Sequence, residues 1–207
     1  MTARCARHIR PLTSVALLTL LAGCATAPVE IHRADLSSPD AASRAPDPDA
    51  PRVWIANIED GRSDTTLGAL AGRSFSSAEL PAWIDGELAA LASPGFAVMT
   101  GPAPGARASL ILRPRLLKAY VDSVNVTKTA VIVLGVDIVA LDGTTTARLY
   151  RGQHASLNWA TSGSEVAGAL QDAAASCLEQ LRVDLEVRLH PGRPPPPRAA
   201  PVEADDT

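Results

Sequence analysis

The sequence predicts an α+β domain in two layers, with a mainly antiparallel sheet and two helices packed on one face. Three observations lead to this fold class. Residues 127–141 alternate in a way typical of a long strand with one buried face. The Asp142-Gly143 dipeptide then marks a hairpin turn into a second extended segment. Finally, residues 78–95 and 161–189 carry apolar residues at spacings of three and four, which indicates two amphipathic helices.

The elements are expected in the order β-loop-α-β-β-β-β-α, within a single domain at residues 52–189. Pro81 suits the first turn of the first helix, and Ser162 with Glu165 matches a capping box at the start of the second. The segment 59–77, rich in Gly, Ser and Asp, is expected to be a long loop with room for one short edge strand. Strands are expected at 52–58, 96–100, 107–123, 127–141 and 145–160.

The second face of the 127–141 strand is more apolar than an open sheet face usually is. It carries Val131, Val133 and Val139, whereas an antiparallel sheet open to water alternates more cleanly. Scattered exposed β-branched residues are also common. If the face is covered, the segment 59–77, a second protomer and a lipid-bearing partner are the alternatives. We therefore predict a partner surface centred on these three valines.

The N-terminus has the layout of a secretory signal. Arg4, Arg7 and Arg10 form a positive region, and residues 12–22 form an apolar stretch of the expected length, about 7–15 residues. This stretch is shorter than the ~20 apolar residues that a membrane span needs. The sequence therefore predicts that residues 1–23 are a signal peptide.

The signal ends in Leu21-Ala22-Gly23-Cys24, which resembles the bacterial lipobox. The resemblance implies cleavage between Gly23 and Cys24, and a covalent lipid on Cys24 as the only attached group. Several acyl chains, each adding ~0.8 kcal/mol per buried CH₂, would anchor the chain durably. Ala25 stands where an Asp would signal retention in the inner membrane, so the resemblance implies the outer membrane, with the protein facing the periplasm.

Two segments flank the predicted domain. Residues 24–51, rich in Pro, Ala, Ser and Asp, are expected to form the lipidated cysteine and a disordered tether. Residues 190–207 are expected to form a disordered, Pro-rich tail, because Pro194 to Pro197 favour polyproline II. A tether of this length would let the domain sample the periplasm around its anchor.

Charge and cysteine content exclude several functional classes. The formal net charge is −3, and removal of residues 1–23 takes away three arginines and no acid, which leaves −6. Nucleic-acid binding is therefore not expected, since it requires a basic patch. After processing, Cys177 is the one cysteine free of lipid, and its place on an apolar helical stripe favours an inert core residue.

The order of motifs resembles the YajG-type bacterial lipoproteins. The lipobox is followed by DGRSDTTLGALAGR (60–73), a helix leading into GFAV (95–98), the hairpin ending in LYRGQHASLNWA (149–160) and a helix from SGSEVAGAL (162–170). The resemblance covers roughly residues 24–185 and implies a non-catalytic binding or accessory module of the cell envelope, with an envelope protein or a second copy as partner. A looser resemblance to auxiliary lipoproteins of lipid-transport ABC systems implies the alternative function.

Recognisable catalytic and metal motifs are absent from the sequence. It contains no G-x-S-x-G, no P-loop, and no histidines at zinc-binding spacing. If the protein is an enzyme, the alternative that the sequence offers is a hydrolase that uses Asp60, Asp64 and His154. Asp60-Gly61 is more simply a turn, and His154 lies in a predicted strand without a recognisable partner. We therefore predict no enzymatic activity, no metal and no cofactor.

Overall fold

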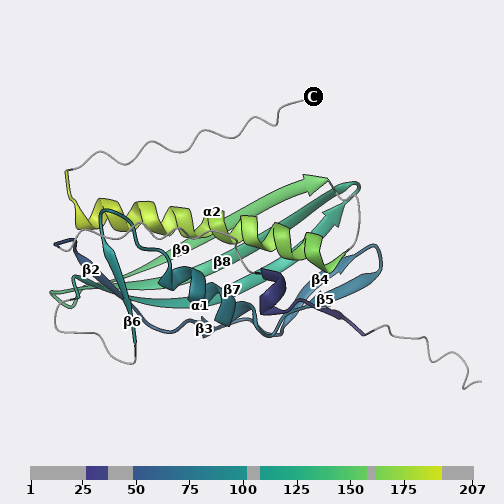
Figure 1. Cartoon of the computed structure of the whole chain (residues 1–207), viewed down its shortest axis with the longest axis horizontal. Helices are drawn as coiled ribbons and strands as arrows, with labels where there is room; N and C mark the ends of the chain where they lie inside the picture. Colours follow the sequence, from purple (N-terminus) through teal and green to yellow (C-terminus); the bar gives the residue numbers. More distant parts are fainter. Residues whose placement is uncertain (1–26, 37–48, 102–107, 158–161, 193–207) are drawn as a thin grey trace, which may run out of the picture.

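The computed structural model describes residues 27–36, 49–101, 108–157 and 162–192. Its elements form an α+β fold in two layers, with a mixed, mostly antiparallel sheet (Figure 1). No helix among the described residues is long and apolar enough to cross a membrane. The helices are α1 (Leu80–Ala89), α2 (Gly163–Leu189) and the short 3₁₀ helix η1 (Arg33–Leu36); the strands are β1 (Val29–Glu30), β2 (Arg52–Ile55), β3 (Glu59–Asp60), β4 (Thr66–Leu70), β5 (Arg73–Ser76), β6 (Ala97–Thr100), β7 (Leu110–Val124), β8 (Thr127–Ala140) and β9 (Thr145–Leu157).

The main sheet has the strand order β6-β2-β7-β8-β9, with β3 also paired to β7. The pairs β7–β8 and β8–β9 are antiparallel, whereas β2 runs parallel to both β6 and β7. Pairing of β7 with β2 ends at Leu112, and pairing with β3 begins at Arg115. Pro114, which has no N–H to donate, thus falls in the gap between the two ladders.

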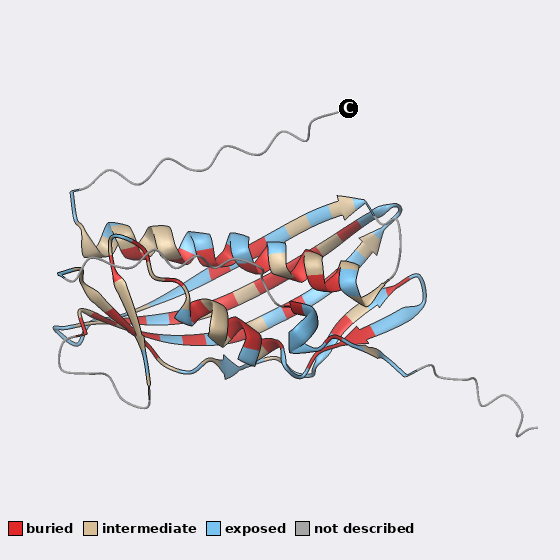
Figure 2. Ribbon diagram, in the orientation of Figure 1, coloured by how far each residue is buried: buried red, intermediate tan, exposed pale blue. Residues whose placement is uncertain are grey.

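One hydrophobic core lies between the sheet and the two helices (Figure 2). The face of β8 predicted to be buried contributes Ile132, Leu134 and Val136, and α2 contributes the predicted stripe. All six residues of that stripe are buried: Val166, Leu170, Ala173, Cys177, Leu181 and Leu185. The predicted fold class is confirmed.

Helix α2 begins as its sequence predicts, with one difference. The Ser162 side chain accepts a hydrogen bond from the Glu165 N–H, at 3.3 Å. The Glu165 carboxylate instead contacts the buried Lys128 Nζ, at 3.4 Å. The Ser162 side chain therefore caps the helix, as predicted. The Glu165 side chain instead holds the start of β8 against the helix.

Gly152 allows α2 to lie directly on β9. A Cβ atom at this residue would come within 2.8 Å of the Cys177 Cβ and nearer still to the backbone carbonyl of Ala173. The edge of β9 is also covered in part, because Gln180 Nε2 donates to the Arg151 carbonyl at 2.8 Å. Such capping discourages unwanted pairing at an edge strand.

The segment 59–77 is more ordered than the expected loop. It contains β3 and an antiparallel pair, β4–β5, which forms a second sheet in the order β1-β5-β4. Gly68 makes the close approach of β4 to β7 possible, since a side chain there would collide with the Val121 carbonyl. Leu67, Leu70 and Phe75 are buried in the core. Their burial explains why these strands form in a sequence rich in turn-forming residues.

Part of the predicted disordered tether is folded onto the domain. Val29–Glu30 pairs with β5, and Ile31 N–H donates to the Ser76 carbonyl at 2.8 Å. The side chains of Ile31 and Leu36 are fully buried. The prediction of a free tether is therefore wrong for residues 29–36, because these two side chains complete the core. Residues 24–26 and 37–48 of that tether, with most of the predicted tail, lie outside the described residues.

Candidate functional site

The sheet face opposite the helices is open. On β9, Tyr150 and Gly152 face α2, and the alternate residues are all exposed: Thr145, Ala147, Leu149, Arg151, Gln153, Ala155 and Leu157. None of the described helices packs on this side, because both α1 and α2 contribute to the single core on the other side. Segment 59–77 does not cover it either, since Leu67, Leu70 and Phe75 belong to that same core.

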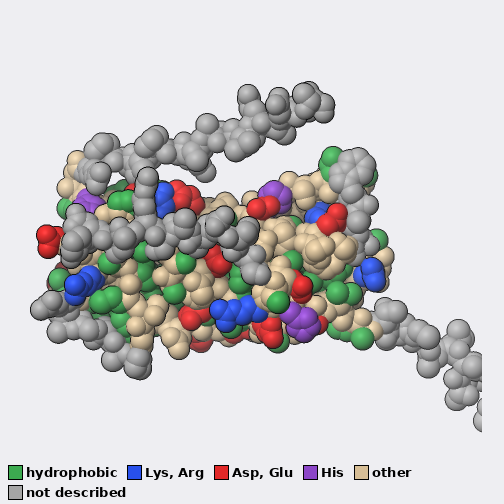
Figure 3. Space-filling model, viewed as in Figure 1, with side chains coloured by type: hydrophobic (Ala, Val, Ile, Leu, Met, Phe, Trp, Pro, Cys, Tyr) green, Lys and Arg blue, Asp and Glu red, His purple; other side chains and the backbone are tan. Residues whose placement is uncertain are grey.

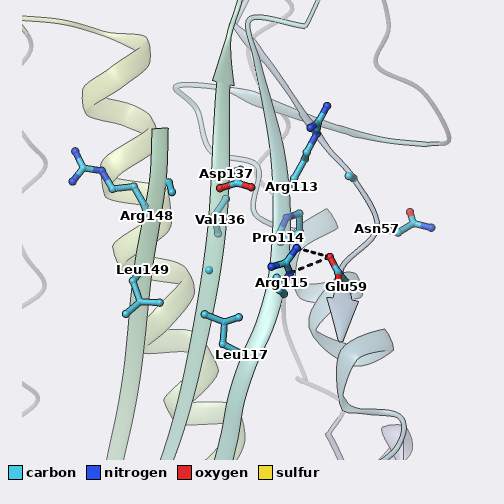
Figure 4. A pocket seen from close by; sticks show the side chains of 13 residues that line it. Asn57, Glu59, Arg113, Pro114, Arg115, Leu117, Val136, Asp137, Arg148 and Leu149 are labelled. Atoms are coloured by element: carbon cyan, nitrogen blue, oxygen red, sulfur yellow. Dashed lines mark hydrogen bonds and ion pairs between the residues drawn. The ribbon is translucent and has the colours of Figure 1, made fainter. Parts of the chain in front are cut away.

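A hollow of about 630 Å³ lies on this open face, across β7, β8 and β9 (Figure 4). Its position depends on a β-bulge at Leu117: the pairing steps from Leu116 opposite Leu134 to Lys118 opposite Val133. The bulge turns Leu117 outward over Gly135, where a Cβ would lie 3.0 Å from the leucine Cδ1. The hollow is lined by Ala56, Asn57, Glu59, Arg113, Pro114, Arg115, Leu117, Gly135, Val136, Asp137, Ala147, Arg148 and Leu149.

Charges of both signs surround the aliphatic part of the hollow. Arg115 forms an ion pair with Glu59 at 2.9 Å, and both side chains are more than half exposed. Such a pair contributes only ~0–1 kcal/mol to stability. Arg113 and Asp137 are cross-strand neighbours, yet neither forms an ion pair with any described residue, and the same holds for Arg148. Figure 4 shows the Arg148 side chain pointing away from Asp137.

This combination suits recognition of a protein surface better than chemistry. Protein interfaces combine an apolar centre with a polar rim and are enriched in arginine. Here Leu117 and Leu149 supply the apolar part, and Arg113 and Asp137 supply charges that no described residue neutralises. On the opposite, helix-side face, acidic and basic side chains are interspersed without a large basic patch among the described residues (Figure 3).

Val131 is not accessible, so the predicted surface needs a correction at this residue. Its exposed fraction is 1 %, although it does not belong to the main core. Its cross-strand neighbours on the same face are Tyr120 and Gln153, two long side chains that flank it on either side. Val133 and Val139 are partly exposed. A partner on this face could thus touch Val133 and Val139 but not Val131.

The structure does not bring Asp60, Asp64 and His154 together. Asp60 accepts from Arg62 Nε at 2.9 Å, and Asp64 accepts from the Thr66 N–H at 2.7 Å. These hydrogen bonds hold the pKa of both carboxyl groups below the usual range. His154 lies on β9, three strand spacings from β3, or ~14 Å.

The local partners of these groups are structural. His154 Nε2 lies 3.4 Å from the carboxylate of Asp172 on α2. The buried Arg62 reaches from Asp60 to the carbonyl of Ser77, at 3.1 Å, and so fixes the chain after β3. Among the described residues no group of three or more His, Cys, Asp or Glu side chains could hold a metal ion. The side chains that a hydrolase site would need therefore do not lie together in this structure.

Local sequence patterns predict little of the hollow. Arg113 and Arg115 alternate with buried residues on β7, which is what any solvated strand face shows. The bulge at Leu117 and the placement of Glu59 beside β7 both depend on long-range pairing. A local signal did exist in Gly135, a small residue in the middle of the most regular strand.

Comparison with known proteins yields similarity of fold only. No protein-family model matches the sequence, and no curated protein does. One solved structure, described only as an uncharacterized protein, has a TM-score of 0.50 at 13% identity, covering 65% of this chain and 92% of its own. A Xanthomonas campestris protein of the family DUF330 has a TM-score of 0.47 at 16% identity, covering 68% and 86%. A lipoprotein of Neisseria meningitidis has a TM-score of 0.35 at 13% identity, covering 63% and 97%.

Proposed function

We propose that this chain is a lipid-anchored lipoprotein of the bacterial envelope that acts as a non-catalytic binding module for another protein. The lipobox-like residues 21–24 and an order of motifs that resembles the YajG type support the anchor and the envelope location. The outer membrane is the proposed site, because Ala25 follows Cys24. The membrane thus holds the protein through its lipid, while the folded domain faces the periplasm.

The observation that carries the binding role is the open face with its hollow. An unpartnered sheet face that combines Leu117 and Leu149 with unpaired charges at Arg113 and Asp137 has the composition of an interface. The dispersed positions of Asp60, Asp64 and His154 favour binding over hydrolysis. Without a partner, the exposed Leu149 costs solvation free energy and stabilises nothing.

Crosslinking in living cells tests this proposal. A photo-crosslinking amino acid at Leu149, whose side chain is 66 % exposed, should capture one defined protein. The matched control is Val187, an aliphatic residue on the helix face that is 44 % exposed. Arg113→Glu should abolish capture from residue 149 without unfolding the domain, since Arg113 is exposed. Equal capture from residues 149 and 187, or capture that survives the charge reversal, contradicts the proposal.

The identity of the captured protein separates the finer alternatives. A component of a lipid-transport ABC system would indicate the auxiliary role, and a second copy of the chain would indicate a homo-oligomer. The anchor is tested separately by mass spectrometry of the protein extracted from membranes. The mature chain should begin at Cys24 and carry acyl chains, and Cys24→Ala should release it from the membrane. An unmodified N-terminus at Ala25 or later would contradict the anchor.

A further inference from the structure

The folded part of the chain begins very close to the predicted lipid. Ala27 is the first described residue, and only two residues separate it from Cys24. Three trans peptide steps span at most ~11 Å between the Cα atoms of residues 24 and 27. The chain is then fixed at β1, where the Glu30 carboxylate accepts from the Ser76 hydroxyl at 2.6 Å and from the Ala78 N–H at 2.9 Å.

The short connection places one end of the domain at the membrane. In Figure 1, β1 and the β4–β5 turn lie at one end of the long axis of the molecule, and α2 runs toward the other end. The β7–β8 turn and the C-terminal end of β9 lie at the same end as β1 (Figure 1), and β9 ends at Leu157. A lipid on Cys24 would therefore bring this end, rather than a side of the sheet, to the bilayer.

Three exposed aliphatic side chains gather at that end. The exposed fractions are 67 % for Val124, 65 % for Val126 and 53 % for Leu157. The register places them on adjacent strand ends, because Thr127 pairs with both Val124 and Leu157. Asn125 between the two valines has φ +56°, which meets the backbone requirement of the turn without any need for apolar neighbours.

Residues 123–127 of the β7–β8 turn carry no charged side chain, and the nearest charge before them is the exposed Asp122. The nearest lysine, Lys128, is 3 % exposed and points its Nζ to Glu165. Hairpin turns in water usually carry polar residues, as the β8–β9 turn at the other end does with Asp142-Gly143-Thr144. An uncharged turn flanked by valines is suited to the boundary between headgroups and acyl chains, where apolar side chains leave water.

We propose that Val124, Val126 and Leu157 form a membrane-contacting tip that enters the interfacial region of the phospholipid bilayer holding the Cys24 acyl chains. This inference rests on the proposed lipid anchor. The acyl chains tether the domain, and the tip fixes its orientation, with the long axis of the sheet rising from the membrane. The occupant of the tip surface is the bilayer itself.

Site-specific fluorescence tests the tip directly. The full lipidated chain carrying Val126→Cys is labelled with an environment-sensitive NBD probe and reconstituted in vesicles of phosphatidylethanolamine and phosphatidylglycerol. The native Cys177 is fully buried and will not compete. The matched control is Leu141→Cys at the opposite hairpin end, an aliphatic position that is even more open, at 80 % exposed. Nitroxide lipids with shallow labels should quench the probe at residue 126 at least ~threefold more than at residue 141.

A second set of variants measures what the tip contributes. Val124→Asp combined with Val126→Asp should return the environment of a probe at Leu157→Cys to that of water, while circular dichroism and lipidation stay unchanged. Equal quenching at residues 126 and 141 in chains that float with the vesicles would overturn the tip and leave the anchor intact. Protection of residue 126 in cells but not in vesicles would also overturn it, in favour of a protein contact. Absence of acyl chains in the mass spectrum would overturn the anchor itself.

Discussion

Replacing Gly152 with alanine tests how closely α2 lies on β9. A Cβ atom at residue 152 would lie 2.7 Å from the Cys177 backbone nitrogen and nearer still to the Ala173 carbonyl oxygen. Ordinary van der Waals contact begins at 3.4 Å, so the Cys177 nitrogen alone requires a retreat of about 0.7 Å, and the nearer Ala173 oxygen requires more. Both obstacles are helix backbone, so no change of rotamer relieves them. Overpacking typically costs ~1–3 kcal/mol, and we expect the upper end, ~3 kcal/mol.

That loss is measurable by thermal or urea unfolding followed by circular dichroism. For a chain of this size each kcal/mol shifts Tm by ~2–4 °C, so Gly152→Ala should lower Tm by ~6–12 °C. The control is Gly168→Ala on the same helix, where a Cβ meets nothing within 4 Å. Removing a helical glycine should stabilise the fold by ~0.8–1 kcal/mol. A Gly152→Ala variant within ~0.5 kcal/mol of the parent would refute the close packing of α2 on β9.

Three further predictions follow from buried or paired groups. Ile31→Ala should lower the free energy of unfolding by ~2–5 kcal/mol, because Ile31 is fully buried. An unchanged free energy of unfolding in urea would contradict the packing of residues 29–36 on the domain. The Ser76 hydroxyl and the Ala78 N–H lower the pKa of Glu30, so docking of β1 should be strongest above pH ~4.5 and weaken as the pH falls through the folded value; amide exchange of Ile31 should report this, and Glu30→Gln should flatten it. Burial raises the pKa of Cys177 to about 11, so the thiol should resist alkylation at pH 8 until urea unfolds the chain; rapid labelling of the native protein would contradict its burial.

The parts of the fold predicted well are those with a strong local period. The strand expected at 127–141 is β8 at Thr127–Ala140, and the second helix begins after Ser162 as its cap predicts. Alternation and helical stripes repeat along the whole length of an element, so one residue that departs from the pattern does not hide it. The first helix is predicted to run to the stop signal at Ser93-Pro94-Gly95, but it ends at Ala89, although Leu91 is still buried.

The parts that were missed depend on contacts far apart in the chain. Ile31 and Leu36 are two apolar residues in a segment with the composition of a linker, and only the core between β5 and α2 gives them a place. The same holds for the candidate site. Alternation on β8 indicated a half-apolar second face, but which valine is covered depends on Tyr120 and Gln153 across the ladders. The hollow, in turn, depends on the bulge at Leu117.

The ordered N-terminal segment changes how the two proposals relate to each other. With a free tether of 27 residues, the distance between the hollow and the membrane would vary widely. With β1 fixed near Cys24, the hollow has a defined height: Arg113 lies 11 residues along β7 from Val124, or ~35 Å at the rise of a strand. A partner of Leu149 should therefore project well above the headgroups. A crosslink from residue 149 to lipid would contradict both the tip and the orientation that it imposes.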